Sequence, residues 1–407
     1  MNIKITAVIK EGTAWLETNG ESPLRVTVAD EKLCVCLYYS FREEPLHLNA
    51  DIKAGDRIEI KITDIRIELF VNEELRDEEW PAGKISLCSE SLSCGDFALS
   101  TVFFEREAKD APLSSIRHNV KIEDIRKNGI NIGDCMPYSY EEDTGARGDG
   151  RYHLFFLRDR HHHGSKWGLG AHQWAHISTD NFQTWEEHPM AVPVEAQYEG
   201  SICTGSVIYA EGKYYAWYSV RMYDSTPARF KFSVSENGIN FKKSEDYFIV
   251  PNKYQQIRAR DPKIIFFDRK YHMFITTNLI SNGKGCLAHL VSDKPDMSNY
   301  KDLGAMIEYD GCEHPECPDW FKIGDYFYLV FSIDGVARYA YSKEPFSNWR
   351  FPNNNAIWCG LVPKSAIFGG KRIFAGFTGD GGYGGDVVFC EAKQQINGEL
   401  RFEYYDK

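Results

Sequence analysis

Five stretches in the later part of the sequence repeat one pattern, in which a turn leads into a strand rich in aromatic residues. They begin roughly 45 to 60 residues apart, which is about the length of one four-stranded propeller blade. Five repeats predict a five-bladed β-propeller, and no segment shows the sustained periodicity of a helix. The expected fold class is therefore all-β. The five stretches are DGRYHLFFL from Asp149, EGKYYAWYS from Glu211, DRKYHMFIT from Asp268, GDYFYLVFS from Gly324 and GGKRIFAGF from Gly369.

The residues before these repeats predict a separate domain. They contain short segments in which polar and apolar residues partly alternate, the pattern of half-buried strands. We expect a small antiparallel β-sandwich over 1–108 and the propeller over 109–407. The sandwich either binds sugar or braces its neighbour, and bracing is the simpler expectation. The charged stretch Glu105–Ser115 is the expected connector. Expected strands include Ile3–Val8, Leu24–Val28, Leu33–Tyr39 and Arg57–Ile62.

The composition excludes several classes of partner. The 407 residues have a net charge of −12, and no run of Lys or Arg forms the basic face that nucleic acid requires. No apolar stretch is long enough to span a membrane, and the first residues lack a signal-peptide core. The 11 cysteines are an odd number without CxxC pairs, which fits free thiols in a reducing compartment. We expect a cytoplasmic protein without a cofactor, and the oligomeric state is left open.

Three acidic residues near the starts of predicted blades are candidates for catalysis. They are Asp134 in NIGDCMPY, Asp261 in RARDPKIIF and Glu316 in HPECPDWF. Cleavage of a glycosidic bond needs one carboxylic acid that protonates the leaving oxygen and a second carboxylate that attacks the anomeric carbon or activates water. In a propeller, residues far apart in sequence converge on the central axis. The three residues are therefore candidates for these two roles, in which case the substrate would be an oligosaccharide or small glycoside.

These motifs give the sequence a specific resemblance to glycoside hydrolase family 32, the invertase, inulinase and levanase group. ARDPKI resembles the Arg-Asp-Pro signature of that family, and ECPDWF resembles its Glu-Cys-Pro-Asp signature. GSICTGSVIY resembles its Phe-Ser-Gly-Ser segment. Trp167-Gly168 resembles its Trp-Gly pair, and His172–His176 resembles its His-Trp-Gly-His element with one residue added. The resemblance covers roughly residues 125 to 380, with the motifs in the family's order.

The resemblance implies a role for each carboxylate. Asp134 would be the nucleophile, Glu316 the general acid and then the base, and Asp261 the stabiliser of the transition state, as in retaining chemistry. Arg260 would bind the sugar or a carboxylate. Because a general acid must keep its proton, we expect Glu316 in a desolvated setting with little positive charge, formed by its neighbours Cys317, Pro318 and Trp320.

The sequence departs from the family at positions that recognise sugar. Gly133 stands where the family has Asn, Leu157 where it has Gln, and Cys203-Thr204 where it has Phe-Ser. Loss of amide partners changes which hydroxyls a site can bind, so a fructose-containing substrate is expected but sucrose is not assured. The insert EEDTGARGD after Asp134 either narrows access at the rim or is a solvated loop. The expected substrate-binding residues are Arg260, Trp167, Thr204, Cys203, Arg158 and His172.

Other features support no second chemistry. His161–His163 invite a metal interpretation, but adjacent imidazoles on an extended segment point to opposite faces, so no metal is expected there. We expect these histidines and Arg158-Asp159 at the rim of the site. The Gly379–Val387 run lacks Lys and a following helix, so it predicts a tight hairpin rather than a phosphate loop. Three alternatives stay open: an inverting arabinofuranosidase or xylosidase of the family 43 type, a fructosyltransferase, and a non-catalytic carbohydrate-binding protein.

Overall fold

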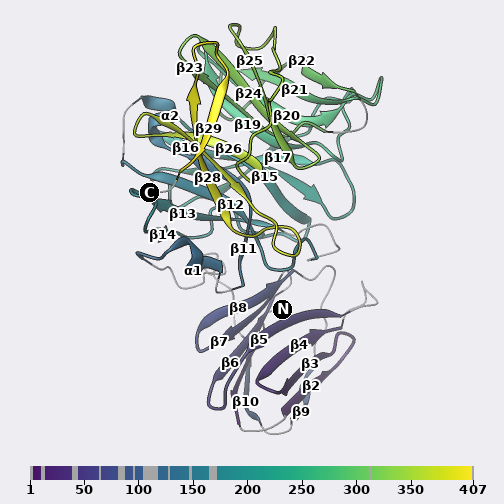
Figure 1. The fold of residues 1–407 in the computed structure, drawn as a ribbon. Coiled ribbons are helices and arrows are strands. Elements are labelled where there is room, and N and C mark those ends of the chain that lie inside the picture. Colours follow the sequence, from purple (N-terminus) through teal and green to yellow (C-terminus); the bar gives the residue numbers. More distant parts are fainter. Residues whose placement is uncertain are drawn as a thin grey trace. The chain divides into compact units, whose positions relative to one another are not determined.

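The computed structural model describes most of the chain as antiparallel β-structure, with two short helices (Figure 1). It forms two compact units. The first contains Met1–Ile116, His163–Ala171 and Pro193–Tyr198, and the second contains Arg117–His162, His172–Val192 and Glu199–Lys407. The predicted connector and the boundary after residue 108 lie outside the described residues. The described residues are 3–10, 14–38, 45–63, 66–80, 88–94, 97–103, 118–126, 129–145, 149–164, 172–310 and 314–405.

The first unit is a β-sandwich of two five-stranded sheets, as the alternating pattern of its sequence predicts. The inward residues of β1, β3 and β6 are buried aliphatics that form one continuous core, and the residues between them are more exposed. One sheet has the order β10 (Phe97–Phe103), β1 (Ile3–Ile9), β6 (Arg57–Ile62), β7 (Ile67–Val71), β8 (Glu74–Glu79). The other has the order β5 (Leu46–Asp51), β4 (Lys32–Leu37), β3 (Leu24–Ala29), β2 (Ala14–Asn19), β9 (Cys88–Cys94).

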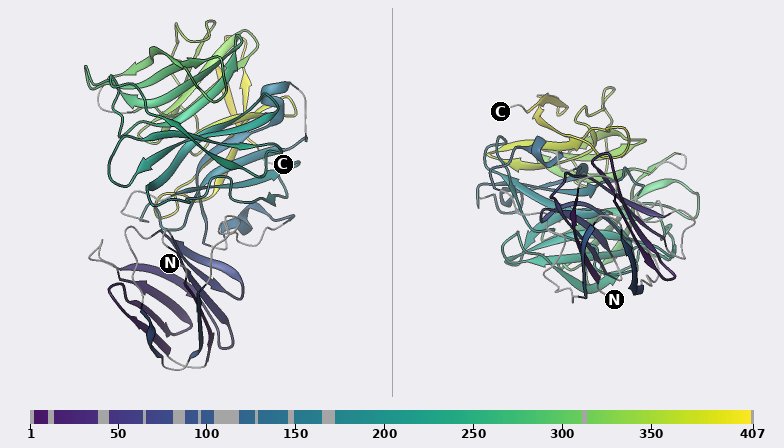
Figure 2. Two further views of the ribbon diagram at one scale, coloured as in Figure 1. Left: turned by 180° about the vertical axis from the view of Figure 1, so that it is seen from behind. Right: turned by 90° about the horizontal axis from the view of Figure 1, so that it is seen from below.

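The second unit is a five-bladed β-propeller. Each blade is one antiparallel sheet of consecutive strands. Figure 2 shows the ribbon from behind and from below. The innermost strands contact one another in the order β11, β15, β19, β23, β26, and β26 contacts β11, so the ring is closed. Blade 1 has β11 (Asn131–Tyr138), β12 (Tyr152–Asp159), β13 (Gln173–Thr179) and β14 (Glu186–Glu187); blade 2 has β15 (Glu199–Ala210), β16 (Lys213–Met222), β17 (Arg229–Ser235) and β18 (Lys242–Phe248).

The other three blades repeat this arrangement. Blade 3 has β19 (Arg260–Phe267), β20 (Lys270–Asn278), β21 (Gly285–Ser292) and β22 (Lys301–Tyr309). Blade 4 has β23 (Glu316–Ile323), β24 (Tyr326–Ile333) and β25 (Val336–Ser342), and blade 5 has β26 (Leu361–Phe368), β27 (Lys371–Phe377), β28 (Val387–Gln394) and β29 (Leu400–Tyr404). The helices are α1 (Ile122–Arg126) and α2 (Tyr140–Thr144). No helix among the described residues has the length and apolar character that a membrane span requires.

The repeated aromatic stretches are the second strand of each blade, β12, β16, β20, β24 and β27, rather than the first. These strands are covered on both faces by neighbouring blades, so they are nearly continuous apolar runs; every residue of β12 is buried. The innermost strand precedes each of them. This order places the polar residues before each aromatic stretch on the strands around the axis.

The described part of the insert after Asp134 does not lie at the rim of the candidate site. Its first residues form α2 at the Tyr138 end of β11, and Asp134 lies toward the other end of that strand. Glu141 accepts hydrogen bonds from the amides of the turn at Gly369 (3.0 Å) and Gly370 (2.9 Å). For the described residues of the insert, the expectation of narrowed access is therefore wrong, because Glu141 binds the turn of the blade 5 hairpin instead.

Candidate active site

Each innermost strand has a β-bulge near its start, where one extra residue enters its pairing with the second strand. A bulge turns side chains out of the regular alternation, and bulges are common beside active sites. All three candidate carboxylates lie in or directly beside one of these bulges. The shifts fall between Ile132 and Cys135, Ile202 and Gly205, Arg260 and Lys263, Glu316 and Asp319, and Leu361 and Lys364.

Three of the bulges hold a non-glycine residue at positive φ. The angles are 57° at Asp261, 51° at Cys317 and 38° at Val362, and each of these residues precedes a proline. A residue held in this region costs of order 1–3 kcal/mol and persists where the surrounding structure fixes it, often at functional sites. The Asp-Pro and Cys-Pro pairs of the two signature motifs are thus bulge residues in strands, not exposed turns.

Asp134 is held by hydrogen-bond donors from three other blades. The Tyr383 hydroxyl donates to Oδ1 (2.8 Å), and the Thr204 hydroxyl donates to Oδ2. The Cys317 thiol lies 3.5 Å from Oδ2. The Tyr383 oxygen also accepts a hydrogen bond from the Asp134 amide (3.0 Å). Donors on both oxygens fix the orientation of the carboxyl group.

Tyr383 explains the glycine that precedes Asp134. A Cβ atom built at Gly133 would lie 2.4 Å from the Tyr383 hydroxyl oxygen, which is closer than two such atoms can approach. The tyrosine thus occupies the space that an Asn side chain would need in this chain. The glycine-rich run that contains Tyr383 joins β27 to β28, as the predicted hairpin requires, but sequence reasoning missed its aromatic residue. Two features of the sequence could have indicated this contact: the single tyrosine between two glycine pairs, and the glycine at 133 where the family has Asn.

Two buried residues, His172 and Asp159, hold Tyr383 in position. The His172 ring stacks on the tyrosine ring at a centroid distance of 4.9 Å. His172 Nε2 lies 2.8 Å from Asp159 Oδ2, and the other oxygen of Asp159 accepts the backbone amides of His161 (2.8 Å) and His162 (2.6 Å). His172 and Asp159 therefore hold the wall of the site.

Asp261 is almost completely buried, at 3% exposure. The Cys317 amide donates to its Oδ2 (3.1 Å), and Arg260 Nε lies 3.6 Å from the same oxygen. Burial raises the pKa of Asp261, and the charges of Arg260 and Lys364 oppose that shift. Cys317 thus contacts two carboxylates, through its amide to Asp261 and through its sulfur to Asp134. Because Glu316 directly precedes Cys317, the three carboxylates lie around this one residue.

Glu316 is the most accessible of the signature carboxylates, with 36% of its side chain exposed. Its Oε1 accepts a hydrogen bond from Arg260 Nη2 at 2.5 Å, so the expected setting with little positive charge is wrong. Trp320 does not flank the carboxyl group either, because its ring packs against Phe267 and Phe327. Burial nevertheless raises the pKa of Glu316, although Arg260 opposes the shift. The direction suits a group that must hold a proton.

Arg260 is itself fixed by neutral partners. Its Nη1 donates to the backbone oxygen of Arg258 (2.9 Å), and its Nη2 lies 3.0 Å from His314 Nδ1. His314 Nε2 pairs with the Asn278 side chain. Burial and the charge of Arg260 lower the pKa of His314 to about 4, so the imidazole is neutral near pH 7. The guanidinium is thereby positioned between Asp261 and Glu316.

A buried ion pair joins the two signature motifs. Lys263, the fourth residue of Arg-Asp-Pro-Lys, lies 2.7 Å from Asp319, the fourth residue of Glu-Cys-Pro-Asp. Burial alone would raise the pKa of Asp319, but the Lys263 ammonium lowers the net value. Ser365 of β26 donates to the other Asp319 oxygen through its amide (2.8 Å) and hydroxyl (2.6 Å). This pair fixes β19 against β23, and with them the spacing of Asp261 and Glu316.

The remaining predicted residues occupy different positions around this centre. Cys203 is partly exposed, and its backbone oxygen accepts the Trp174 indole N–H (2.9 Å). Arg158 is 4% exposed and Asp159 3%, so the expectation that they are rim residues is wrong. His162 and His163 are exposed and His161 is partly exposed. Leu157 is buried, and Trp167 lies outside the described residues.

Comparison with known proteins identifies the family. The model of the Glycosyl hydrolases family 32 N-terminal domain matches residues 145–358, which is more than half of the chain. The chain belongs to glycosyl hydrolase family 32. The matched region contains Asp261, Glu316 and the Lys263–Asp319 pair, and Asp134 precedes it.

Relatives of this family 32 protein are distant. Raffinose invertase of Escherichia coli is 25% identical over 239 residues, which are 56% of this chain and 46% of that protein. A levanbiose-producing levanase of Geobacillus stearothermophilus is 24% identical over 271 residues, 62% of each protein. The chain spans about half the length of the first curated relatives it matches.

Solved structures share its fold. The family 32 β-fructofuranosidase of Bombyx mori has a TM-score of 0.54 and 21% identity, over 69% of this chain and 67% of that chain. A thermostable family 43 glycoside hydrolase has a TM-score of 0.51 and 15% identity, over 67% and 93%. These likenesses support the propeller architecture.

Proposed function

We propose that the protein is a retaining, exo-acting glycosidase that cleaves β-fructofuranoside-like oligosaccharides. The observation that carries this proposal is the convergence of Asp134, Asp261 and Glu316 around Cys317, at bulges of three different blades. Membership of family 32 supports it, because relatives of the chain are named as invertase and levanase. The chain's own residues divide into groups for two chemical steps.

In the first step, Asp134 attacks the anomeric carbon while the glycosidic bond breaks. The leaving oxygen takes a proton from Glu316, so the products of this step are the released sugar, a glycosyl ester on Asp134 and an ionised Glu316. The hydrogen bonds of Tyr383 and Thr204 keep the attacking carboxylate oriented. Asp261 bonds hydroxyls of the sugar and stabilises the positive charge that develops on the ring.

In the second step, water cleaves the ester. Glu316 now removes a proton from the water as its oxygen attacks the anomeric carbon, and Asp134 leaves as a carboxylate. Arg260 supports this exchange of roles. Its guanidinium stabilises Glu316 after the proton has left, and burial raises the pKa of the same carboxyl so that it is protonated again.

The substrate is proposed to differ from that of a standard invertase. Tyr383 fills the space beside Gly133, and Leu157 is buried, so two amide side chains that would bind ring hydroxyls are replaced by a phenol and an apolar group. Hydrogen-bonding groups discriminate strongly between substrates. A terminal fructofuranosyl unit with a different partner sugar or linkage fits this change better than unmodified sucrose.

The test is sugar release from a defined panel by the wild type, Asp134→Asn and Glu316→Gln. The panel contains sucrose, inulin, levan, difructose anhydrides, and aryl arabinofuranoside and xyloside. Fructose release by the wild type, lost in both variants, is the expected result. Glu344→Gln is the matched control, because Glu344 is an exposed carboxylate whose partner is the Ser347 hydroxyl, and it should keep full activity.

The stereochemistry of the first product separates the proposal from its alternatives. Carbon-13 NMR of the anomeric C2 signal of the initial sugar should show retained configuration. Inverted product or pentose release would favour the family 43 type of enzyme, and oligosaccharide growth would favour a fructosyltransferase. Binding of a panel member without turnover by the wild type would favour a carbohydrate-binding protein and refute the catalytic proposal.

A further inference from the structure

The outer face of the first unit carries two cysteines and a histidine in a compact group. On β4 the residues Leu33, Val35 and Leu37 point into the sandwich core, so Cys34 and Cys36 point outward. Outward positions of a sheet are usually polar, and two cysteines two residues apart do not improve the packing of the core. Both thiols are free and only partly buried.

His47 completes the group from the neighbouring strand. It lies on β5 directly opposite Cys36, and its side chain is exposed on the same face because Leu46 and Leu48 point into the core. Its Nδ1 lies 3.2 Å from the Cys36 sulfur and 3.8 Å from the Cys34 sulfur. The two sulfurs are 3.6 Å apart. Backbone pairing of β4 and β5 fixes all three side chains.

These three distances are those of ligands on one tetrahedral metal ion. With a Zn–S distance of about 2.3 Å and a Zn–N distance of about 2.0–2.1 Å, tetrahedral geometry places two sulfurs about 3.8 Å apart and a sulfur and a nitrogen about 3.6 Å apart. The separations of 3.6, 3.2 and 3.8 Å lie within a few tenths of an ångström of these values. Thiolate and imidazole are also the ligand types that zinc prefers.

A disulfide between the two cysteines is a poorer explanation of the same geometry. Residues two apart on a strand have Cα atoms about 6.6–6.8 Å apart, at the upper limit for a disulfide. The sulfurs at 3.6 Å are also well beyond the bond length of about 2.05 Å. A disulfide would, moreover, give His47 no role.

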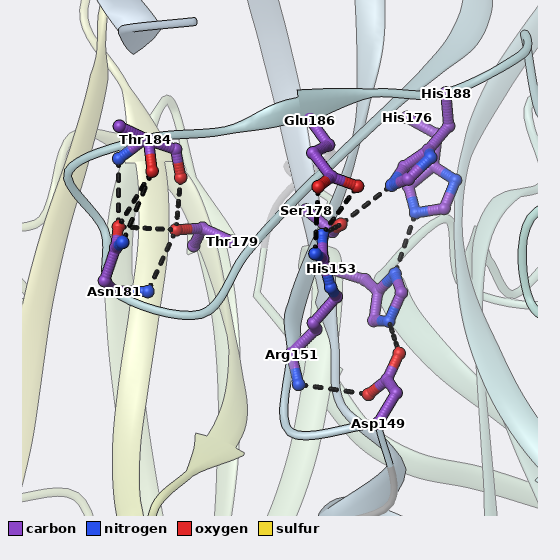
Figure 3. Close-up of polar contacts among 10 residues, drawn as sticks. All are labelled: Asp149, Arg151, His153, His176, Ser178, Thr179, Asn181, Thr184, Glu186 and His188. Atoms are coloured by element: carbon purple, nitrogen blue, oxygen red, sulfur yellow. Dashed lines mark hydrogen bonds and ion pairs between the residues drawn. The ribbon is translucent and has the colours of Figure 1, made fainter. Parts of the chain in front are cut away.

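A second group of possible ligands, in blade 1, has a structural explanation instead. His153 on β12 lies 2.8 Å from Asp149 and 2.9 Å from His176 on β13, and His188 pairs with the Ser178 hydroxyl at 2.7 Å (Figure 3). The imidazoles therefore bond to one another and to blade residues.

The same pair of histidines recurs in blade 3. His272 on β20 and His289 on β21 are 2.8 Å apart, and they stand at the strand positions of His153 and His176, again four residues after an aspartate. A pair that repeats between blades is part of how the blades pack. The cysteine group of the first unit has no such counterpart among the described residues.

We propose that Cys34, Cys36 and His47 bind one Zn²⁺ ion on the outer face of the sandwich, with the fourth position open to water or an incoming ligand. Two thiolates and one neutral imidazole give the complex no net charge. Because all three side chains are at least partly exposed, the ion enters from solvent without any change in the core. The site is independent of the proposed glycosidase chemistry.

Metal binding by the full chain tests the proposal. Metal-free protein, kept reduced, is titrated with Zn²⁺ in competition with a chromophoric chelator, and with Co²⁺ while its absorption spectrum is followed. We expect one tightly bound ion per chain, with sulfur-to-cobalt charge-transfer absorption and the visible bands of tetrahedral cobalt. Each of Cys34→Ser, Cys36→Ser and His47→Ala should weaken binding by at least about 100-fold, more than the loss of an outer-sphere partner.

Two matched controls distinguish this site from others. Asn49→Ala changes an exposed residue two positions from His47 on the same strand face, and His188→Ala removes an imidazole from the blade 1 group. Both should keep wild-type affinity. All the substitutions at the proposed site lie outside the core, so the thermal unfolding of the metal-free variants should match that of the wild type. Equal Zn²⁺ affinity in a Cys34→Ser/Cys36→Ser/His47→Ala chain, or cobalt binding without the sulfur band, would overturn the proposal.

Discussion

Removal of one oxygen atom from Tyr383 should slow catalysis far more than it alters substrate binding. Tyr383→Phe deletes the hydroxyl that donates to Asp134 Oδ1 at 2.8 Å and accepts from the Asp134 amide at 3.0 Å. The ring can stay stacked on His172, so the shape of the wall is kept. The substitution therefore isolates the hydrogen bonds to the proposed nucleophile.

The size of the effect follows from the orientation of the attacking oxygen. Without the phenol hydroxyl, Asp134 Oδ1 is no longer held in place, and a misplaced reacting group costs up to about 100-fold in rate, or about 2.7 kcal/mol at 1.36 kcal/mol per factor of ten. We therefore expect kcat to fall about 10- to 100-fold. Thr204 still holds the other carboxylate oxygen, so activity should not be abolished. KM should change little, because Tyr383 acts through Asp134.

Initial rates over a range of substrate concentrations, with the best substrate of the panel, measure this prediction. Tyr339→Phe is the control: it removes a buried tyrosine hydroxyl that bonds to Leu400 in the outer part of blades 4 and 5. Both variants should lose some stability, but the control should keep wild-type kcat well below its unfolding temperature. Wild-type kcat in Tyr383→Phe, or an equal loss of kcat in the control, would refute a positioning role for Tyr383.

Three further predictions concern the same centre. Gly133→Ala places a Cβ 2.4 Å from the Tyr383 oxygen, so kcat should fall at least tenfold, and circular dichroism should show an intact fold. Asp319→Leu leaves Lys263 buried without its partner and should lower the free energy of unfolding by about 3–5 kcal/mol in urea titrations, whereas Lys263→Met/Asp319→Leu should recover most of that loss. Burial raises the pKa of Glu316. As the proposed general acid, Glu316 must be protonated, so kcat/KM should fall on the alkaline side at a pH above the usual carboxyl range. A fall centred near pH 4.5 would contradict this assignment.

The propeller was predictable because its most regular strands are its most buried ones. The second strand of each blade is covered on both faces, so β12 and β20 read as apolar runs that repeat along the sequence. The innermost strands were harder to recognise. Their bulges interrupt the alternation of side chains and insert residues such as Asp261 and Pro262, which are typical of turns.

The candidate carboxylates could be located from motifs, but most of their partners could not. Tyr383 bonds Asp134 across 249 positions of sequence, from a glycine-rich hairpin whose local pattern indicates only a turn. Arg260 was expected near the site. Its bond to Glu316, however, depends on the packing of β19 against β23 and on the bulge in each strand. Such contacts are set by the closure of the ring, and no local pattern encodes that closure.

In the proposed mechanism, the residues that fix the spacing of the carboxylates differ from those proposed to select the substrate. Lys263 and Asp319 tie together the two signature motifs that contain Asp261 and Glu316. The proposed recognition positions, in contrast, lie on separate strands and loops, and Tyr383 fills the space beside Gly133. A framework fixed by a buried ion pair permits changes of this kind without loss of carboxylate spacing. For this reason we expect substrate preference in the chain to be altered by substitutions around Tyr383, while Asp261 and Glu316 keep their positions.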